Sequence, residues 1–202
     1  MLQRLAVAAA VLIALTGVAA CGSRDTDHQP KSSSSQGAPT SNPADVTFAS
    51  SMIPHHRQAL EMVTLTTGRT LDPAVRTLAD RIRAAQAPEI ETMSRWLADW
   101  AKPVPGATAT GHDSHDMGGM EMGSDEMPGM MSATEMASLQ KASDAEFQDM
   151  WLRMMIRHHE GAITMAKAEL ADGSYGPAKD LAQQIIDGQQ AEIDQMKQLL
   201  AS

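Results

Sequence analysis

An internal repeat is the feature of this sequence that most constrains its fold. The stretch MIPHH at residues 52–56 recurs as MIRHH at residues 155–159, an offset of 103 positions. Other residues recur at the same offset with no insertion: Ala59, Met62, Leu78, Ala79, Ile82, Gln86, Glu89, Ile90 and Met93 match Ala162, Met165, Leu181, Ala182, Ile185, Gln189, Glu192, Ile193 and Met196. So many identities at one offset indicate two copies of one structural unit.

Capping signals indicate that each copy is a helical hairpin. Asn42-Pro43 and Asp72-Pro73 each place an N-cap residue before a proline, and Gly68 is a typical stop. We expect helices at these positions: 43–67, 73–101, 133–142, 144–171 and 177–202. Two hairpins with one apolar stripe each bury those stripes by packing together. The sequence therefore predicts an all-α, four-helix bundle at 43–202, with hairpins at 43–100 and 132–202 and a loop at 101–131.

The first 42 residues are expected to lie outside this bundle. Residues 1–20 carry Arg4 and an apolar run too short for a bilayer span, which fits a signal peptide. The sequence VAAC that ends at Cys21 resembles a bacterial lipobox, so we expect Cys21 to be lipidated; an ordinary secretory signal is the alternative. Residues 21–42 are rich in Ser, Pro and Gly and read as a flexible tether. We therefore expect an extracytoplasmic protein anchored to the bacterial cell membrane.

Composition excludes several classes of function. The chain has 25 acidic and 16 basic side chains, which argues against a nucleic acid partner because such partners need a basic surface. Its single cysteine excludes an internal disulfide framework and a cysteine-based zinc site. The sequence has no nucleophile elbow, P-loop, dinucleotide fingerprint or HExxH motif, so no enzyme is expected.

Polar residues fall in the middle of the apolar stripes. On a helical projection His56 and His159 face the bundle core, and Glu89 and Glu192 do the same on the second arm of each hairpin. A buried carboxylate is costly unless it is paired. We expect these histidines and glutamates to pair as a polar second shell, without assigning which pairs with which. The alternative is that they only set the helix register.

The other histidine of each pair suggests a metal site. His55 and His158 are expected at the edge of the stripe, three residues after Met52 and Met155. Residues three apart share a helix face with about 4.5 Å of rise, so one ion can contact both side chains. A thioether and imidazole set is soft and favours Cu(I), although core packing explains these methionines equally well. Two further methionines lie too far along their helices for the same ion and are core or a second site: Met62 and Met165.

The loop at 111–131, GHDSHDMGGMEMGSDEMPGMM, is rich in soft ligands. The candidate ligands are His112, His115, Met117, Met120, Met122, Met127, Met130 and Met131. Glycine, proline and acidic residues oppose a continuous buried helix, so core packing does not explain these methionines. We expect a site that scavenges Cu(I) or Ag(I), with Cu(II) binding at the two histidines; a linker of biased composition is the alternative.

The paired motifs resemble a known family. MIPHH, MIRHHEGA at 155–162 and the two Gln-x-x-Glu-Ile-x-x-Met runs at 86–93 and 189–196 are similar to the domain of unknown function family 305, which includes CopM-type secreted copper-binding proteins. The resemblance covers residues 44–202. It implies a ferritin-like four-helix bundle and a role in copper binding or tolerance outside the cytoplasm.

Three functions are compatible with these patterns. The favoured one is a lipid-anchored protein that sequesters copper or hands it to a copper-handling protein partner. The second is a helical interaction module at the cell surface. The third is a di-metal redox enzyme, which usually needs Glu-x-x-His motifs that this chain lacks.

Overall fold

The computed structural model describes residues 40–106 and 127–201. These residues form five α-helices: α1 (Pro43–Thr64), α2 (Pro73–Asp99), α3 (Ala133–Lys141), α4 (Asp144–Asp172) and α5 (Gly176–Leu200). The all-α prediction is confirmed, and the helix ends agree with the expected ones to within a few residues. The expected signal peptide, Cys21, nearly all of the tether and most of the methionine-rich loop lie outside the described residues.

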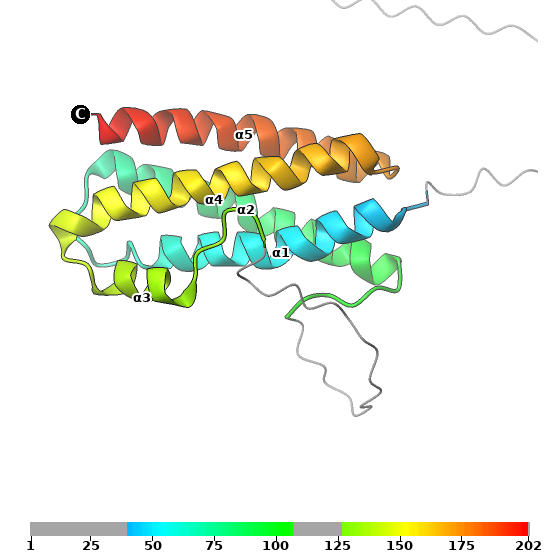
Figure 1. Ribbon diagram of the computed structural model, residues 1–202, viewed down its shortest axis with the longest axis horizontal. Coiled ribbons are helices and arrows are strands. Elements are labelled where there is room, and N and C mark those ends of the chain that lie inside the picture. The colour runs from blue at the N-terminus through cyan, green and yellow to red at the C-terminus, as the bar shows by residue number, and fades with distance from the viewer. Residues whose placement is uncertain (1–39, 107–126, 202) are drawn as a thin grey trace, which may run out of the picture. The chain divides into compact units, whose positions relative to one another are not determined.

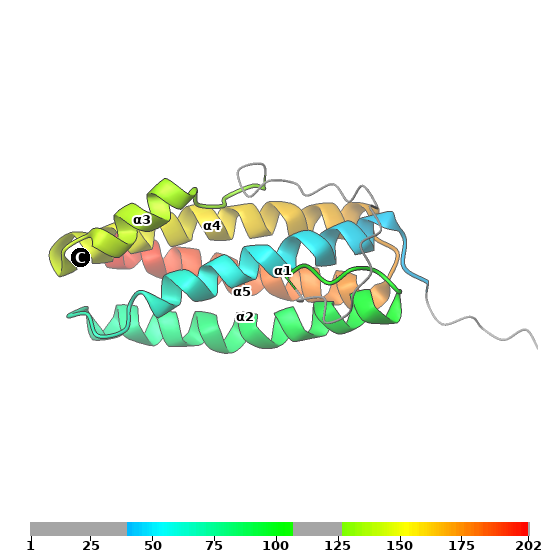
Figure 2. The ribbon, with the colours of Figure 1, turned by 90° about the horizontal axis from the view of Figure 1, so that it is seen from below.

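The four long helices lie side by side, and helices that are adjacent in the bundle run antiparallel (Figures 1 and 2). Helix α1 pairs with α2 and α4 pairs with α5, and the bundle closes through α1 with α4 and α2 with α5. The short helix α3 packs against α4 on the outside of the bundle. No helix in the described ranges is both long and apolar enough to cross a membrane.

Local chemistry accounts for the helix ends. The Asn42 side chain accepts hydrogen bonds from the backbone N–H of Ala44 and Asp45, and the Asp45 carboxylate accepts one from the backbone N–H of Asn42. This capping box satisfies donors that the first turn of a helix leaves free. Helix α1 ends three residues before the expected Thr67, because the chain continues in tighter turns up to Gly68, whose φ of 78° suits glycine.

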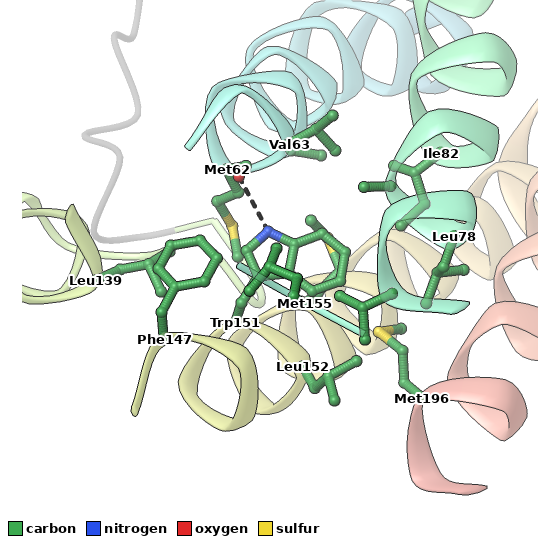
Figure 3. Packing of buried hydrophobic residues seen from close by; sticks show 14 of the residues in the cluster. Met62, Val63, Leu78, Ile82, Leu139, Phe147, Trp151, Leu152, Met155 and Met196 are labelled. Atoms are coloured by element: carbon green, nitrogen blue, oxygen red, sulfur yellow. Dashed lines mark hydrogen bonds between the residues drawn. The ribbon is translucent and has the colours of Figure 1, made fainter. Parts of the chain in front are cut away.

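The apolar core forms two clusters along the bundle. One surrounds Trp151, whose indole Nε1 donates to the backbone carbonyl of Met62 at 2.9 Å (Figure 3). Met155 and Met196 pack in this same cluster. The other cluster contains Met52 and residues of α1, α2, α4 and α5 near the opposite end.

Candidate metal site

The two histidine pairs lie on α1 and α4, and all four imidazoles are fully buried. The prediction that His55 and His158 lie at the edge of the stripe was therefore wrong. A projection of one hairpin misses the contact between α1 and α4, which covers the face that carries these two residues. Residues that follow the loop supply further cover.

His55 and His158 face each other across the α1–α4 interface. Their ring centroids are 3.7 Å apart, with an interplanar angle of 38°. Each lies about 6.5 Å from the other histidine of its own pair, at 6.5 Å for His55 and His56 and 6.4 Å for His158 and His159. The fold therefore gathers four imidazoles from two distant parts of the sequence into one buried group.

The outer histidines of this group contact carboxylates within their own hairpins. His56 Nε2 lies 2.6 Å from Glu89 Oε2, and His159 Nε2 lies 2.8 Å from Glu192 Oε2. The glutamates remain 19% and 15% exposed, so each carboxylate bridges a buried ring to the solvent side of the bundle. These contacts supply the partners that the sequence leaves unassigned.

A backbone carbonyl orients the ring of His55. The oxygen of Pro128 lies 3.1 Å from His55 Nε2 and can only accept a hydrogen bond, so Nε2 carries the proton. In the neutral ring Nδ1 then holds a free lone pair. The glutamates act in the same way on His56 and His159. Metal-binding histidines typically donate their other N–H to such an acceptor, which orients the ligand nitrogen.

Several ring nitrogens in this group have no partner in the described part of the chain. They are Nδ1 of His55, His56 and His159, and both ring nitrogens of His158. A buried polar atom with no hydrogen bond costs about 1–3 kcal/mol. Five such atoms lie in one layer of the bundle, where each offers a hydrogen bond or a lone pair to a ligand.

The central pair is held in the neutral form. Burial, together with the neighbouring His56, lowers the pKa of His55 to about 3. Burial also holds the pKa of His158 well below the usual range, with a further contribution from His55. Neutral imidazole is the form that binds metal ions. These two rings therefore stay ready for a metal across the physiological pH range.

The donor set limits what such a site can hold. No three His, Cys, Asp or Glu side chains among residues 40–106 and 127–201 converge closely enough to hold a metal ion. Methionine thioethers are the other soft donors on the helices that carry the histidines. Met52 and Met155 are fully buried one helical turn before His55 and His158. Met62 is fully buried beside Trp151, and Met165 is partly buried.

The structure divides the predicted loop ligands into three groups. His112, His115, Met117, Met120 and Met122 lie outside the described residues. Met127 and Met130 are partly buried at the surface. Met131 is 1% exposed and packs in the core, so its assignment to an exposed string of methionines was wrong. The residues of α3 that follow Met131 lay the chain against the bundle, which the local composition of the loop does not reveal.

Some polar residues of the interior were not singled out as site residues from the sequence. The amides of Gln86 and Gln189 are buried one helical turn before Glu89 and Glu192, and they have no hydrogen-bond partners among the described residues. Gln58 is also buried and binds the backbone of Met131. The repeat itself marks Gln86 and Gln189, whereas nothing in the sequence marks Gln58.

Comparisons with known proteins place this geometry in context. The family described as "Domain of unknown function (DUF305)" matches residues 45–200. A DUF305 fragment from Deinococcus radiodurans is 30% identical, with a TM-score of 0.68 over 81% of this chain and 99% of the other. A DUF305 protein from Streptomyces coelicolor, described as secreted, is 36% identical, with a TM-score of 0.66 over 78% and 92%.

A third similar structure is that of CopM in its Cu(II)-bound form. It is 30% identical, with a TM-score of 0.61 over 78% of this chain and 95% of the other. CopM in its Cu(I)-bound and Ag-bound forms is similar at 29% and 28% identity. No protein of curated function matches the sequence significantly.

Proposed function

The chain belongs to the DUF305 family, and from this membership and the buried histidine group we propose that it is a copper-binding protein of the cell exterior. It would bind Cu(I), and also Ag(I) or Cu(II), to limit the toxicity of the metal or to hand it on. We also propose that the bundle is ferritin-like, that residues 1–20 are a signal peptide and that Cys21 carries a lipid anchor. We propose no catalytic activity.

One observation carries the proposal: His55 and His158 are buried against each other, and His55 Nδ1 and both ring nitrogens of His158 lack hydrogen-bond partners among the described residues. Two neutral imidazoles with buried thioethers nearby form a soft donor set. Soft sets select Cu(I) over Zn(II) or Mg(II), and Ag(I) shares the preference of Cu(I) for few, soft ligands. CopM, with a similar fold, has been solved with Cu(I), Cu(II) and Ag.

We assign the roles as follows. His55 and His158 are the central ligands of the folded site, with Met52 as the thioether ligand on one side of the pair and Met155 on the other. His56 and His159, held by Glu89 and Glu192, form its second shell. The loop residues form a collector of lower affinity: His112, His115, Met117, Met120, Met122, Met127 and Met130. Met62 and Met165 are core residues or belong to a second site.

A titration with Cu(I) against a chromophoric chelator tests the proposal on residues 22–202. We expect tight binding that falls sharply in the His55→Ala/His158→Ala variant and is unchanged in His28→Ala, which alters a tether histidine. Circular dichroism of each variant verifies that the bundle is intact. Failure of every form to compete with the chelator for Cu(I) would overturn the copper proposal.

A surface interaction module is the second candidate, and one observation favours it. The rings of Trp96 and Trp100 of α2 stack with centroids 6.2 Å apart, and both pack edge to face with the ring of Tyr175. All three rings are partly exposed, and partly exposed aromatic residues are enriched in protein interfaces. Capture of a specific partner, abolished by Trp96→Ala and Trp100→Ala but not by the histidine variants, would support this function.

A further inference from the structure

Residues 127–131, which we call the strap, cross over the outside of α1 and α4 just before α3. The carbonyl of Pro128 in the strap is the hydrogen-bond acceptor for His55. The strap therefore touches the central histidine pair directly. It also connects the methionine-rich loop to the folded bundle, so it stands between the two sets of candidate ligands.

The side chain of Gln58 clamps one end of the strap to α1. Its Nε2 donates to the carbonyl of Met131 at 2.8 Å, and its Oε1 accepts from the N–H of Met131 at 2.7 Å. Gln58 is 9% exposed and Met131 is 1% exposed, so both hydrogen bonds lie out of water. A buried pair of this kind stabilises one arrangement of the strap, because opening it leaves polar groups unpaired unless water enters.

Two glycines let the strap lie directly on α4. A Cβ added to Gly161 would lie 2.0 Å from the Pro128 oxygen, and a Cβ added to Gly129 would lie 2.6 Å from the Arg157 oxygen. Neither distance is compatible with a real side chain. Gly129 also has a φ of 79°, which favours glycine. Any other residue at position 161 would force the strap away from the helix, and with it the carbonyl that holds His55.

The outer side of the strap carries soft ligands. Met127 and Met130 line a shallow surface hollow together with Ser132, Glu135 and Arg157. Across the strap from this hollow lies the buried histidine pair. An ion that enters from the hollow meets two thioethers before it meets an imidazole.

We propose that the strap is the gate of the histidine pair: it opens to admit a soft metal ion from the hollow and closes through the Gln58 clamp and the Pro128–His55 hydrogen bond. This inference rests on the proposed function only for the identity of the ion. Access of any small reagent to His55 and His158 is controlled by the same movement. The gate can therefore be tested without metal.

The test uses diethyl pyrocarbonate, which modifies accessible neutral imidazoles, on the metal-free full chain. Peptide mass spectrometry follows the modification rates of His55 and His158. The variants are Gly161→Ala, which displaces the strap by its methyl group, and Gln58→Ala, which removes both hydrogen bonds of the clamp. The matched control is Gly188→Ala, because a Cβ at Gly188 meets nothing within 4 Å.

We expect Gln58→Ala to react about thirtyfold faster than the parent at His55 and His158, since it removes two net hydrogen bonds of about 1 kcal/mol each from the closed state. Gly161→Ala should also react faster, because its methyl group displaces the strap. The Gly188→Ala control should react at the parent rate. Urea unfolding verifies that each variant is folded. If Gly161→Ala does not fold, the Gln58→Ala variant still tests the gate.

A parallel measurement follows the association rate of Ag(I) in the same variants. Faster modification together with faster Ag(I) association supports the gate. Faster modification with no Ag(I) or Cu(I) binding in any form also supports the gate and instead overturns the proposed function. Equal modification rates in the folded variants, the control and the parent overturn the gate whatever the metal affinity.

Discussion

The carboxyl groups of Glu169 and Asp45 lie next to each other at the end of the bundle where the chain passes from α4 to α5. Both residues are almost fully buried. Asp45 accepts hydrogen bonds from the backbone N–H of Ser174 at 3.0 Å and of Tyr175 at 2.9 Å, whereas no N–H or O–H among the described residues donates to Glu169. Two adjacent buried carboxyl groups are stable when one keeps its proton, and the donors around Asp45 make Glu169 that one.

The stability of the metal-free protein should therefore fall as pH rises through neutrality. Burial and the neighbouring Asp45 raise the pKa of Glu169 from 4.5 to about 8. Between these values the folded state holds a proton that the unfolded state has released, so the free energy of unfolding decreases as pH rises and levels off above about pH 8. Urea unfolding at pH 5, 6.5 and 8.5 measures this decrease.

The Glu169→Gln variant tests whether the Glu169 proton causes this pH dependence of stability. A neutral amide does not titrate, so we expect the variant to lose most of the decrease and to exceed the parent in stability at pH 8.5. Glu160→Gln alters an exposed residue of the same helix and should follow the parent curve. If Glu169→Gln and the parent show parallel pH curves, Glu169 is ionised in the folded state and the assignment is wrong.

Asp45 should be among the most sensitive positions for folding. Burial opposes its ionisation, but backbone hydrogen bonds, chiefly from Asn42 and Tyr175, hold the pKa of Asp45 below its usual range. Asp45→Ala leaves buried N–H groups of Ser174 and Tyr175 unpaired and removes the capping box of α1. We expect a loss of about 3–5 kcal/mol in the free energy of unfolding.

Chemical denaturation at pH 6 measures this loss. Asp187→Ala, which removes an exposed carboxylate that accepts from Gln183 in α5, is the control and should change stability by less than about 1 kcal/mol. A similar small change in Asp45→Ala would mean that water or other groups satisfy the turn, and that this end of the bundle does not depend on the carboxylate.

The contribution of the Met52 and Met155 sulfurs to metal binding can be measured separately from the contribution of these side chains to core packing. Leucine has a similar volume, so Met52→Leu and Met155→Leu should each cost less than about 1.5 kcal/mol of stability. If these sulfurs bind the metal, Cu(I) affinity should nevertheless fall at least about tenfold. Competition with a chelator measures the affinity, and thermal unfolding monitors the fold.

The repeat supplies the controls for this experiment. Met93 and Met196 are equally buried on α2 and α5 and occupy equivalent positions in the two copies. Met93→Leu and Met196→Leu should leave Cu(I) affinity unchanged. Equal affinities in all four variants would assign Met52 and Met155 to core packing alone.

The repeat and the capping residues were sufficient to predict the helices, because helix ends depend on local sequence and the packing of the bundle favours the same helices. The position of the central histidines was not predictable in the same way. His55 and His158 are covered by a contact between the two hairpins and by Pro128, which lies 73 residues from His55. A helical projection contains neither contact. The pairing of Glu169 with Asp45 was not predictable for the same reason, since the two residues are 124 positions apart and no matching carboxylates stand at the equivalent positions of the repeat.

The burial of Met131 also changes how the loop should be tested. Deletion of residues 111–131 would remove the strap along with the loop, so a loss of copper binding would not distinguish the two. A sharper variant replaces only the loop ligands that precede the strap with serine: His112, His115, Met117, Met120 and Met122. This variant keeps the Gln58 clamp and the contact of Pro128 with His55.

We expect the serine variant to bind fewer equivalents of Cu(I) while it keeps the tightest site. Thioethers of a collector add capacity, whereas buried imidazoles preorganised by second-shell acceptors add affinity. Equilibrium dialysis measures the stoichiometry, and chelator competition measures the affinity. Serine replacement of Thr108 and Thr110 is the control for the altered loop composition. Loss of the tightest site in the serine variant would instead make the loop the principal copper site and the bundle its scaffold.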